Sequence, residues 1–120
     1  MKRVLTVDDS ASMRAMITFT LKGENYAVTE AVDGAEGYRQ AEAGDFDLII
    51  SDVNMPVMNG FEFVAKIRQV ERYRFTPILM LTTESGVELK QQGKAAGATG
   101  WIVKPFDPEK LIAVVNKVLR

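Results

Sequence analysis

Short apolar runs alternate with amphipathic segments along the whole chain. Four of the runs are continuous and are bounded by turn or capping residues, and a fifth, more mixed run lies between the first two of them. Continuous apolar runs of this kind are typical of strands that are covered on both faces of a sheet. The predicted strands are residues 4–7, 26–31, 48–50, 78–81 and 101–103.

Four segments that follow these strands carry apolar residues at the spacing of an amphipathic helix. Two of them begin with the form of a capping box, Asp33 with Glu36 and Asn59 with Glu62. The last one begins with an aspartate cap and a proline at the first helical position. The helical spacing extends over residues 13–21, 35–41, 61–70 and 111–118.

A fifth helix is predicted over residues 85–98, and it is the weakest of the set. Gly93 interrupts the segment, and its only large apolar residues are Val87 and Leu89. We therefore expect this helix to be mobile. The complete pattern is a strand followed by a helix, repeated five times, which predicts an α/β fold with a parallel sheet, right-handed crossovers and helices on both faces.

Composition narrows the chemistry that such a fold can carry. The chain has 120 residues, 47% hydrophobic and 26% charged, so we expect one domain over residues 1–120. Its net charge of -1 and dispersed lysines and arginines argue against nucleic-acid binding. The absence of cysteine and histidine leaves a hard, oxygen-liganded cation as the expected metal. No signal or membrane-spanning segment is evident, so we expect a cytoplasmic protein.

Polar side chains follow four of the five predicted strands. Open parallel sheets bind ligands at the carboxyl ends of their strands, so these side chains are expected at one rim. Taken singly, each has an ordinary structural explanation: a helix cap, the end of a strand or a solvated charge. Their recurrence at four strand ends favours a functional site. The residues are Asp8, Asp9, Asp52, Thr82, Thr83 and Lys104.

The three carboxylates need a cation. Two carboxylates about 5 Å apart at an effective dielectric near 20 repel by roughly 3 kcal/mol. One lysine, Lys104, does not offset three such pairs, and Mg²⁺ fits carboxylate and phosphate oxygens best. Asp52 stands alone after the most buried strand and is the predicted nucleophile, because carboxylates form aspartyl phosphates. The rim is therefore predicted to carry phosphoryl chemistry.

Four motifs make the sequence resemble a bacterial two-component response-regulator receiver domain, and in particular the stand-alone, CheY-like chemotaxis members of that family. The resemblance covers essentially the full chain. The resemblance implies a single doubly wound, flavodoxin-like domain with five parallel strands in the order 2-1-3-4-5. The motifs are "VDDS" at 7–10, "DVNMPVMNG" at 52–60, "PILMLTTES" at 77–85 and "GWIVKPF" at 100–106.

The resemblance also implies a role for each polar residue at the rim. Asp52 would accept the phosphoryl group. Asp9, Asp52 and the backbone carbonyl of Asn54 would coordinate Mg²⁺, with Asp8 acting through a water. Thr82 would bond the phosphoryl group, and Lys104 would pair with it.

Three further expectations come from the same family. The Lys104–Pro105 bond would be cis. Asn54 and Glu84 would tune the hydrolysis of the acyl phosphate. Trp101 would occupy the aromatic switch position, where tyrosine or phenylalanine is commoner, and two interpretations stay open: an indole that turns inward on activation, or a fixed surface anchor for partners.

The resemblance implies a signalling switch, not an enzyme apart from Mg²⁺-dependent self-phosphorylation and autodephosphorylation. A CheA-like histidine kinase would phosphorylate it, and the expected monomer would then bind a flagellar motor switch protein or another target, with a phosphatase as a further partner. The partner surface would carry Lys90, Lys94, Trp101 and Lys117. Alternatives are a phosphate sink or phosphorelay intermediate, a haloacid-dehalogenase-type phosphohydrolase and, last, a flavin carrier.

Overall fold

The structure, a computed structural model, describes residues 1–83, 86–105 and 107–119. Its centre is a five-stranded parallel sheet in the order β2-β1-β3-β4-β5. The sheet confirms the predicted fold class and strand order. The strands are β1 (Arg3–Val7), β2 (Ala27–Ala31), β3 (Leu48–Asp52), β4 (Ile78–Thr82) and β5 (Gly100–Val103).

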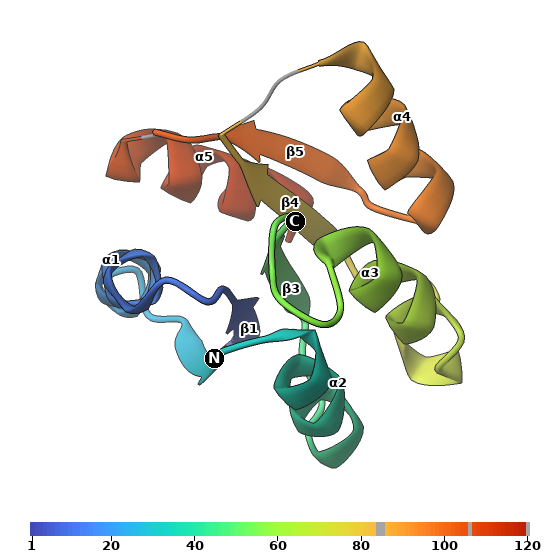
Figure 1. Cartoon of the computed structure of the whole chain (residues 1–120). Coiled ribbons are helices and arrows are strands. Elements are labelled where there is room, and N and C mark those ends of the chain that lie inside the picture. Colours follow the sequence, from blue (N-terminus) through green and yellow to red (C-terminus); the bar gives the residue numbers. More distant parts are fainter. Residues whose placement is uncertain (84–85, 106, 120) are drawn as a thin grey trace.

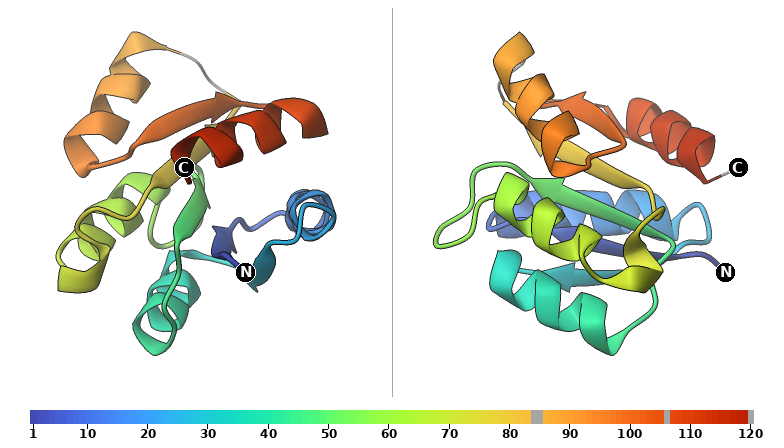
Figure 2. Two further views of the ribbon diagram at one scale, coloured as in Figure 1. Left: turned by 180° about the vertical axis from the view of Figure 1, so that it is seen from behind. Right: turned by 90° about the vertical axis from the view of Figure 1, so that its right-hand side faces the viewer.

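Helices cover both faces of the sheet (Figures 1 and 2). Two of them, α1 and α5, lie on one face, and the other three lie side by side on the opposite face. The helices are α1 (Ala11–Lys22), α2 (Gly34–Ala43), α3 (Gly60–Arg68), α4 (Val87–Ala96) and α5 (Pro108–Val118), with a 3-10 turn, η1 (Glu71–Tyr73), before β4.

The two faces of the sheet bury two separate apolar cores. Strand residues alternate between them, so Val4 packs under α1 and α5 whereas Leu5 packs toward α2 and α3. The central strands β3 and β4 are buried along their whole length, which explains why their sequences are continuously apolar. Burial on both faces fixes the register, and the register fixes which side chains meet at the rim.

The predicted capping boxes differ in how they form. In α3, the Asn59 side chain accepts from the Glu62 amide at 2.9 Å while the Glu62 carboxylate accepts from the Asn59 amide at 3.1 Å. In α2, Asp33 accepts from the Glu36 amide at 2.8 Å, but the Glu36 carboxylate accepts from the amide of Val32, one residue earlier. Both helices therefore begin where the sequence predicted.

The segment before β4 is anchored to the end of α2 by hydrogen bonds. Tyr73 is fully buried, and its hydroxyl donates to the carbonyls of Ala41 and Gly44 at 2.6 and 3.0 Å. Arg72 donates to the same two carbonyls. These bonds satisfy the C-terminal carbonyls of α2, which would otherwise be left without partners. Phe75, by contrast, is 87% exposed.

Helix α4 is shorter than predicted, and residue 85 lies outside the described residues. Gly93, which the sequence pattern marked as an interruption, is buried and serves packing. A Cβ at this position would lie 2.9 Å from Cζ3 of Trp101 on β5. The glycine therefore allows α4 to approach the indole closely. No helix in the described ranges has the length and apolar character needed to cross a membrane.

Candidate functional site at the carboxyl ends of the strands

Three carboxylates meet where β1 and β3 end. One oxygen from each of Asp8, Asp9 and Asp52 lies within 4.8 Å of the others. The strand order makes β1 and β3 neighbours, so the residues that follow β1 and the last residue of β3 reach the same point. Asp8 and Asp52 are 1% and 6% exposed, whereas Asp9 is exposed. The predicted acidic cluster is therefore present, with two of its members out of water.

Lys104 places its ammonium between the two buried carboxylates. Its Nζ donates to Oδ2 of Asp8 and to Oδ1 of Asp52, each at 3.2 Å, and the lysine side chain is only 12% exposed. The backbone holds it there, because the Lys104 amide donates to the Thr82 carbonyl at 2.6 Å. The following bond, to Pro105, is cis. A solvated surface charge is thus the wrong description of this lysine.

The backbone around Asp8 is fixed on several sides. The Asp8 amide donates to the Ala31 carbonyl of β2 at 3.1 Å, and its Oδ1 accepts from the Ser10 amide at 2.9 Å. Ser10 in turn caps α1 by accepting from the Met13 amide. The strand ends at Val7, so the chain turns between two adjacent aspartates and directs both toward one site.

The loop after β3 folds back tightly onto the strand end. The Gly60 amide donates to the Val53 carbonyl at 2.8 Å, and a Cβ on Gly60 would lie 2.2 Å from the Asp52 carbonyl oxygen. Only glycine permits this approach. Val57, 97% exposed in the same loop, has a φ of 69°, a left-handed conformation that is rare for a β-branched residue. The loop that follows Asp52 therefore stores backbone strain at Val57.

The electrostatics of the cluster disfavour the charged form of Asp52. Burial raises the pKa of its carboxyl above the usual 3.8, and the negative charge of Asp8 raises it further. Lys104 lowers the pKa by its charge and its hydrogen bond, and the Val53 amide also lowers it, but the net shift is upward. Burial and the charge of Asp8 therefore outweigh Lys104 in their effect on the pKa of Asp52.

The remaining residues of the predicted rim differ in their exposure. Thr82 is 1% exposed and ends β4, opposite Val103 of β5 in the register. Thr83 and Asn54 are exposed. Glu84, the other residue expected to tune hydrolysis, lies outside the described residues.

Trp101 does not belong to this cluster. It pairs with Met80 in the register of β4 and β5 and points to the face covered by α3 and α4. Its ring stacks on Phe61 of α3, with the ring centres 6.3 Å apart and the planes 20° apart. Its Nε1 is buried without a hydrogen-bond partner in the described part of the chain. The indole is thus half-buried in a place that Gly93 leaves open.

Sequence reasoning missed Arg14 and Glu30, which lie next to the cluster. Arg14 donates through Nη1 to the Asp8 carbonyl at 2.6 Å and through Nε to the Glu30 carboxylate at 3.1 Å. The helical spacing places Arg14 on α1, but no local pattern connects it to a residue on β2. Edge strand β2 therefore supports the site through this arginine.

The donor set suits a small, hard divalent cation. The cluster offers carboxylate oxygens, and the chain contains no histidine or cysteine that would favour a softer ion. Mg²⁺ is typically held by one or two carboxylates and keeps waters and phosphate oxygens as its other ligands. Three carboxylates share one lysine in this cluster, so a bound cation would offset negative charge that Lys104 leaves.

The chain belongs to the response regulator receiver domain family, whose sequence pattern matches residues 4–116. Receiver domains of two-component response regulators are phosphorylated by histidine kinases, bind Mg²⁺ in their active site and bind downstream targets. They are not enzymes in the usual sense. The family expected from the motifs is confirmed.

Particular relatives include stand-alone and longer proteins. Chemotaxis protein CheY1 of Helicobacter pylori is 40% identical over 98% of this chain and 96% of its own length. The chain spans about half the length of transcriptional regulatory protein ResD of Bacillus subtilis, with 37% identity over 48% of that protein.

Two solved structures extend the comparison. Chemotaxis response regulator CheY4 of Vibrio cholerae is 57% identical, with 99% of both chains covered and a TM-score of 0.96. The receiver domain of sensor histidine kinase PA1611 from Pseudomonas aeruginosa, with magnesium coordinated in its active-site cleft, is 28% identical over 98% of this chain and 97% of that one, with a TM-score of 0.91.

Proposed function

We propose that the chain is a phospho-accepting signalling switch in which a histidine kinase donates a phosphoryl group to Asp52. The observation that supports it is the position of the Asp52 carboxylate, buried at a strand end beside Asp8 and Lys104. In the transfer, an Asp52 oxygen attacks phosphorus, the bond from phosphorus to the donor nitrogen or oxygen breaks, and an aspartyl phosphate forms.

The neighbouring residues prepare Asp52 for this step. Lys104 supplies a positive charge at 3.2 Å from the attacking carboxylate and can follow the developing charge on the phosphoryl oxygens. Asp9, Asp52 and the Asn54 carbonyl are the proposed Mg²⁺ ligands, with Asp8 acting through water. Bound Mg²⁺ would neutralise phosphoryl oxygens and the carboxylates together.

The proposal keeps the family's roles for the residues farther from phosphorus. Thr82, buried at the end of β4, would hydrogen-bond the phosphoryl group. Its shift on phosphorylation would then be transmitted to β5, the neighbouring strand. Asn54 and Glu84 would set the rate at which the aspartyl phosphate hydrolyses. Trp101 would carry the output as a fixed element of the partner surface, because its stacking and burial hold it in place.

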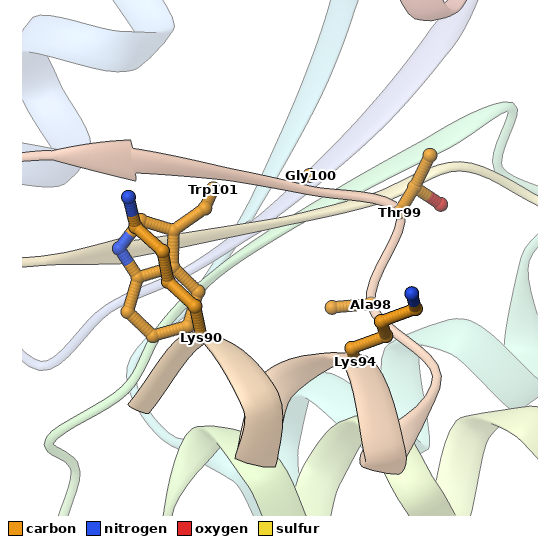
Figure 3. Close-up of a pocket in the computed structure, with 6 residues that line it drawn as sticks. All are labelled: Lys90, Lys94, Ala98, Thr99, Gly100 and Trp101. Carbon is orange, nitrogen blue, oxygen red and sulfur yellow. The ribbon is translucent and has the colours of Figure 1, made fainter. Parts of the chain in front are cut away.

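The proposed output is chemotaxis control in the cytoplasm. A CheA-like kinase would phosphorylate a monomer of one domain, residues 1–120, and the phosphorylated form would bind a flagellar motor switch protein. The similarity to two chemotaxis proteins supports this pathway. The partner surface would include the hollow between α4 and β5, where Lys90, Lys94 and Trp101 lie together (Figure 3).

Two other functions predict different behaviour. A phosphate sink would take up phosphate but show no phosphate-dependent gain in affinity for a motor protein. A haloacid-dehalogenase-type phosphohydrolase would place its nucleophile after the first strand with a second aspartate two residues on, whereas position 10 here is Ser10. That enzyme would turn over many phosphate monoesters for each chain.

Phosphorylation followed by partner capture tests the proposal. With Mg²⁺ and a small acyl or amide phosphodonor, we expect stoichiometric, acid-labile labelling and no continuing turnover of phosphate monoesters. The labelled protein should then bind an immobilised motor switch protein more tightly than the unlabelled protein does. Labelling without a gain in binding would favour the sink, and continuing turnover would favour the phosphohydrolase.

The tryptophan emission spectrum separates a fixed Trp101 from a rotating one. We expect phosphorylation to leave the emission maximum unchanged, because an inward rotation would break the stack on Phe61 and change the environment of the indole. Gly93→Ala supplies the reference spectrum of a displaced indole, since the new Cβ would lie 2.9 Å from Cζ3. Gly86→Ala is the control on the same helix, because nothing lies within 4 Å of its Cβ. A phosphorylation-induced shift of the emission maximum, to the blue on inward burial or to the red as in a displaced indole, would show that Trp101 rotates.

A further inference from the structure

Arg14 connects the backbone of the acidic cluster to the edge strand. Its side chain is 14% exposed, and its guanidinium makes two bonds in different directions: Nη1 to the Asp8 carbonyl at 2.6 Å and Nε to Oε1 of Glu30 at 3.1 Å. Glu30 is itself oriented, because its Oε2 accepts from the Thr18 hydroxyl at 3.0 Å. The planar fork of an arginine holds these two donors on separate nitrogens at fixed positions, whereas a lysine carries all its donors on one nitrogen.

The Asp8 carbonyl is the oxygen of the peptide that leads into Asp9. Among the described residues, the other bonds to Asp8 act on its amide and on its carboxylate, whereas Arg14 bonds its carbonyl and so orients this peptide plane. Asp9 is exposed, and its position therefore depends on the backbone that carries it. A rotation of the peptide would carry the Asp9 carboxylate away from Asp8 and Asp52.

We propose that Arg14, held by Glu30, is a positioning residue that keeps Asp9 directed at the cation site. Partners that orient metal ligands from outside commonly change metal affinity by about 10- to 100-fold when they are removed. Edge strand β2 then contributes to the site without placing a side chain in it. This inference rests on the magnesium site proposed above.

A charge effect and a positioning effect of Arg14 predict opposite changes in Mg²⁺ affinity when Arg14 is removed. If the guanidinium acted only through its charge, its removal would leave the neighbourhood more negative and would tighten Mg²⁺ binding. If it orients the peptide between Asp8 and Asp9, its removal weakens Mg²⁺ binding. A purely structural role would lower the melting temperature and leave the affinity of the folded protein unchanged.

Calorimetric titration of Mg²⁺ into wild type, Arg14→Gln and Arg14→Lys decides between these roles. We expect the Mg²⁺ Kd of Arg14→Gln to rise about tenfold. Arg14→Lys keeps the charge but loses the fork, so its Kd should rise as well. Arg39→Gln, which removes an exposed arginine on α2, is the matched control and should bind as wild type does.

Phosphorylation rates provide the second measurement. The Mg²⁺ concentration for half-maximal labelling of Arg14→Gln should rise with the Kd, while the rate at saturating Mg²⁺ should stay near that of wild type. Should Arg14→Gln not fold, Thr18→Val removes the hydroxyl that orients Glu30 without changing any charge and should shift the Kd in the same direction. An unchanged or tighter Kd in a folded variant would overturn the positioning role, whereas a wild type that binds no Mg²⁺ would overturn the proposed site itself.

Discussion

Asp52→Asn is expected to incorporate no acid-labile phosphate under conditions that label the wild type stoichiometrically. The amide lacks the anionic oxygen that attacks phosphorus, and no other carboxylate in the cluster has the same position beside Lys104 at the end of β3. Phosphate incorporation from a small phosphodonor, measured before and after mild acid treatment, checks the result. Asp45→Asn, an exposed aspartate outside the cluster, is the control and should label normally.

Labelling of Asp52→Asn at the wild-type level would mean that Asp8 or Asp9 is the nucleophile. A loss of labelling in Asp45→Asn as well would mean that the assay reports general damage to the fold. Circular dichroism of both variants separates this outcome from the specific one. The assignment of Asp52 therefore depends on the contrast between the two variants.

The same variant has a predicted effect on stability that depends on pH. The folded protein raises the pKa of Asp52 above 3.8, so the folded state binds the proton more tightly than the unfolded state does. Stability from this group is present at low pH and is lost as pH rises from 3.8 through the higher pKa of the folded state. Asp52→Asn should therefore be more stable than wild type at neutral pH without Mg²⁺, and urea midpoints should converge as pH falls.

Most of the cluster was predictable because it depends on topology alone. Asp8, Asp52 and Lys104 each follow an apolar run, and a parallel sheet brings the carboxyl ends of such runs to one rim. No distance was needed to expect that these three side chains meet. The structure adds that Lys104 lies between the two buried carboxylates rather than in solvent.

The unpredicted features depend on contacts between residues far apart in sequence. In the sequence, Arg14 is one charged residue in a helix and Glu30 is one charged residue in a strand. The two form an ion pair only because α1 packs beside β2. In the sequence, Gly93 resembles a helix breaker, whereas in the structure it makes room for the ring of Trp101. Side-chain identity at each of these positions is ordinary, and the function of each arises from its neighbour.

Lys104→Met should lower the free energy of unfolding by about 2 kcal/mol without Mg²⁺, since hydrogen bonds to charged groups contribute about 1.5–3 kcal/mol. The substitution leaves the buried carboxylates of Asp8 and Asp52 without their shared ammonium. Removing one partner of a buried ion pair is costly because the other charge stays buried. Urea denaturation of wild type and variant at neutral pH measures the change.

Mg²⁺ should stabilise Lys104→Met more than it stabilises the wild type. The ammonium competes with a cation for the same carboxylates, so its loss leaves a more negative site, and Mg²⁺ should raise the melting temperature of the variant more than that of wild type. Lys110→Met, which removes an exposed lysine on α5, should change neither the stability nor the Mg²⁺ response. Equal Mg²⁺ shifts in wild type and Lys104→Met would mean that the lysine and the cation do not share their ligands.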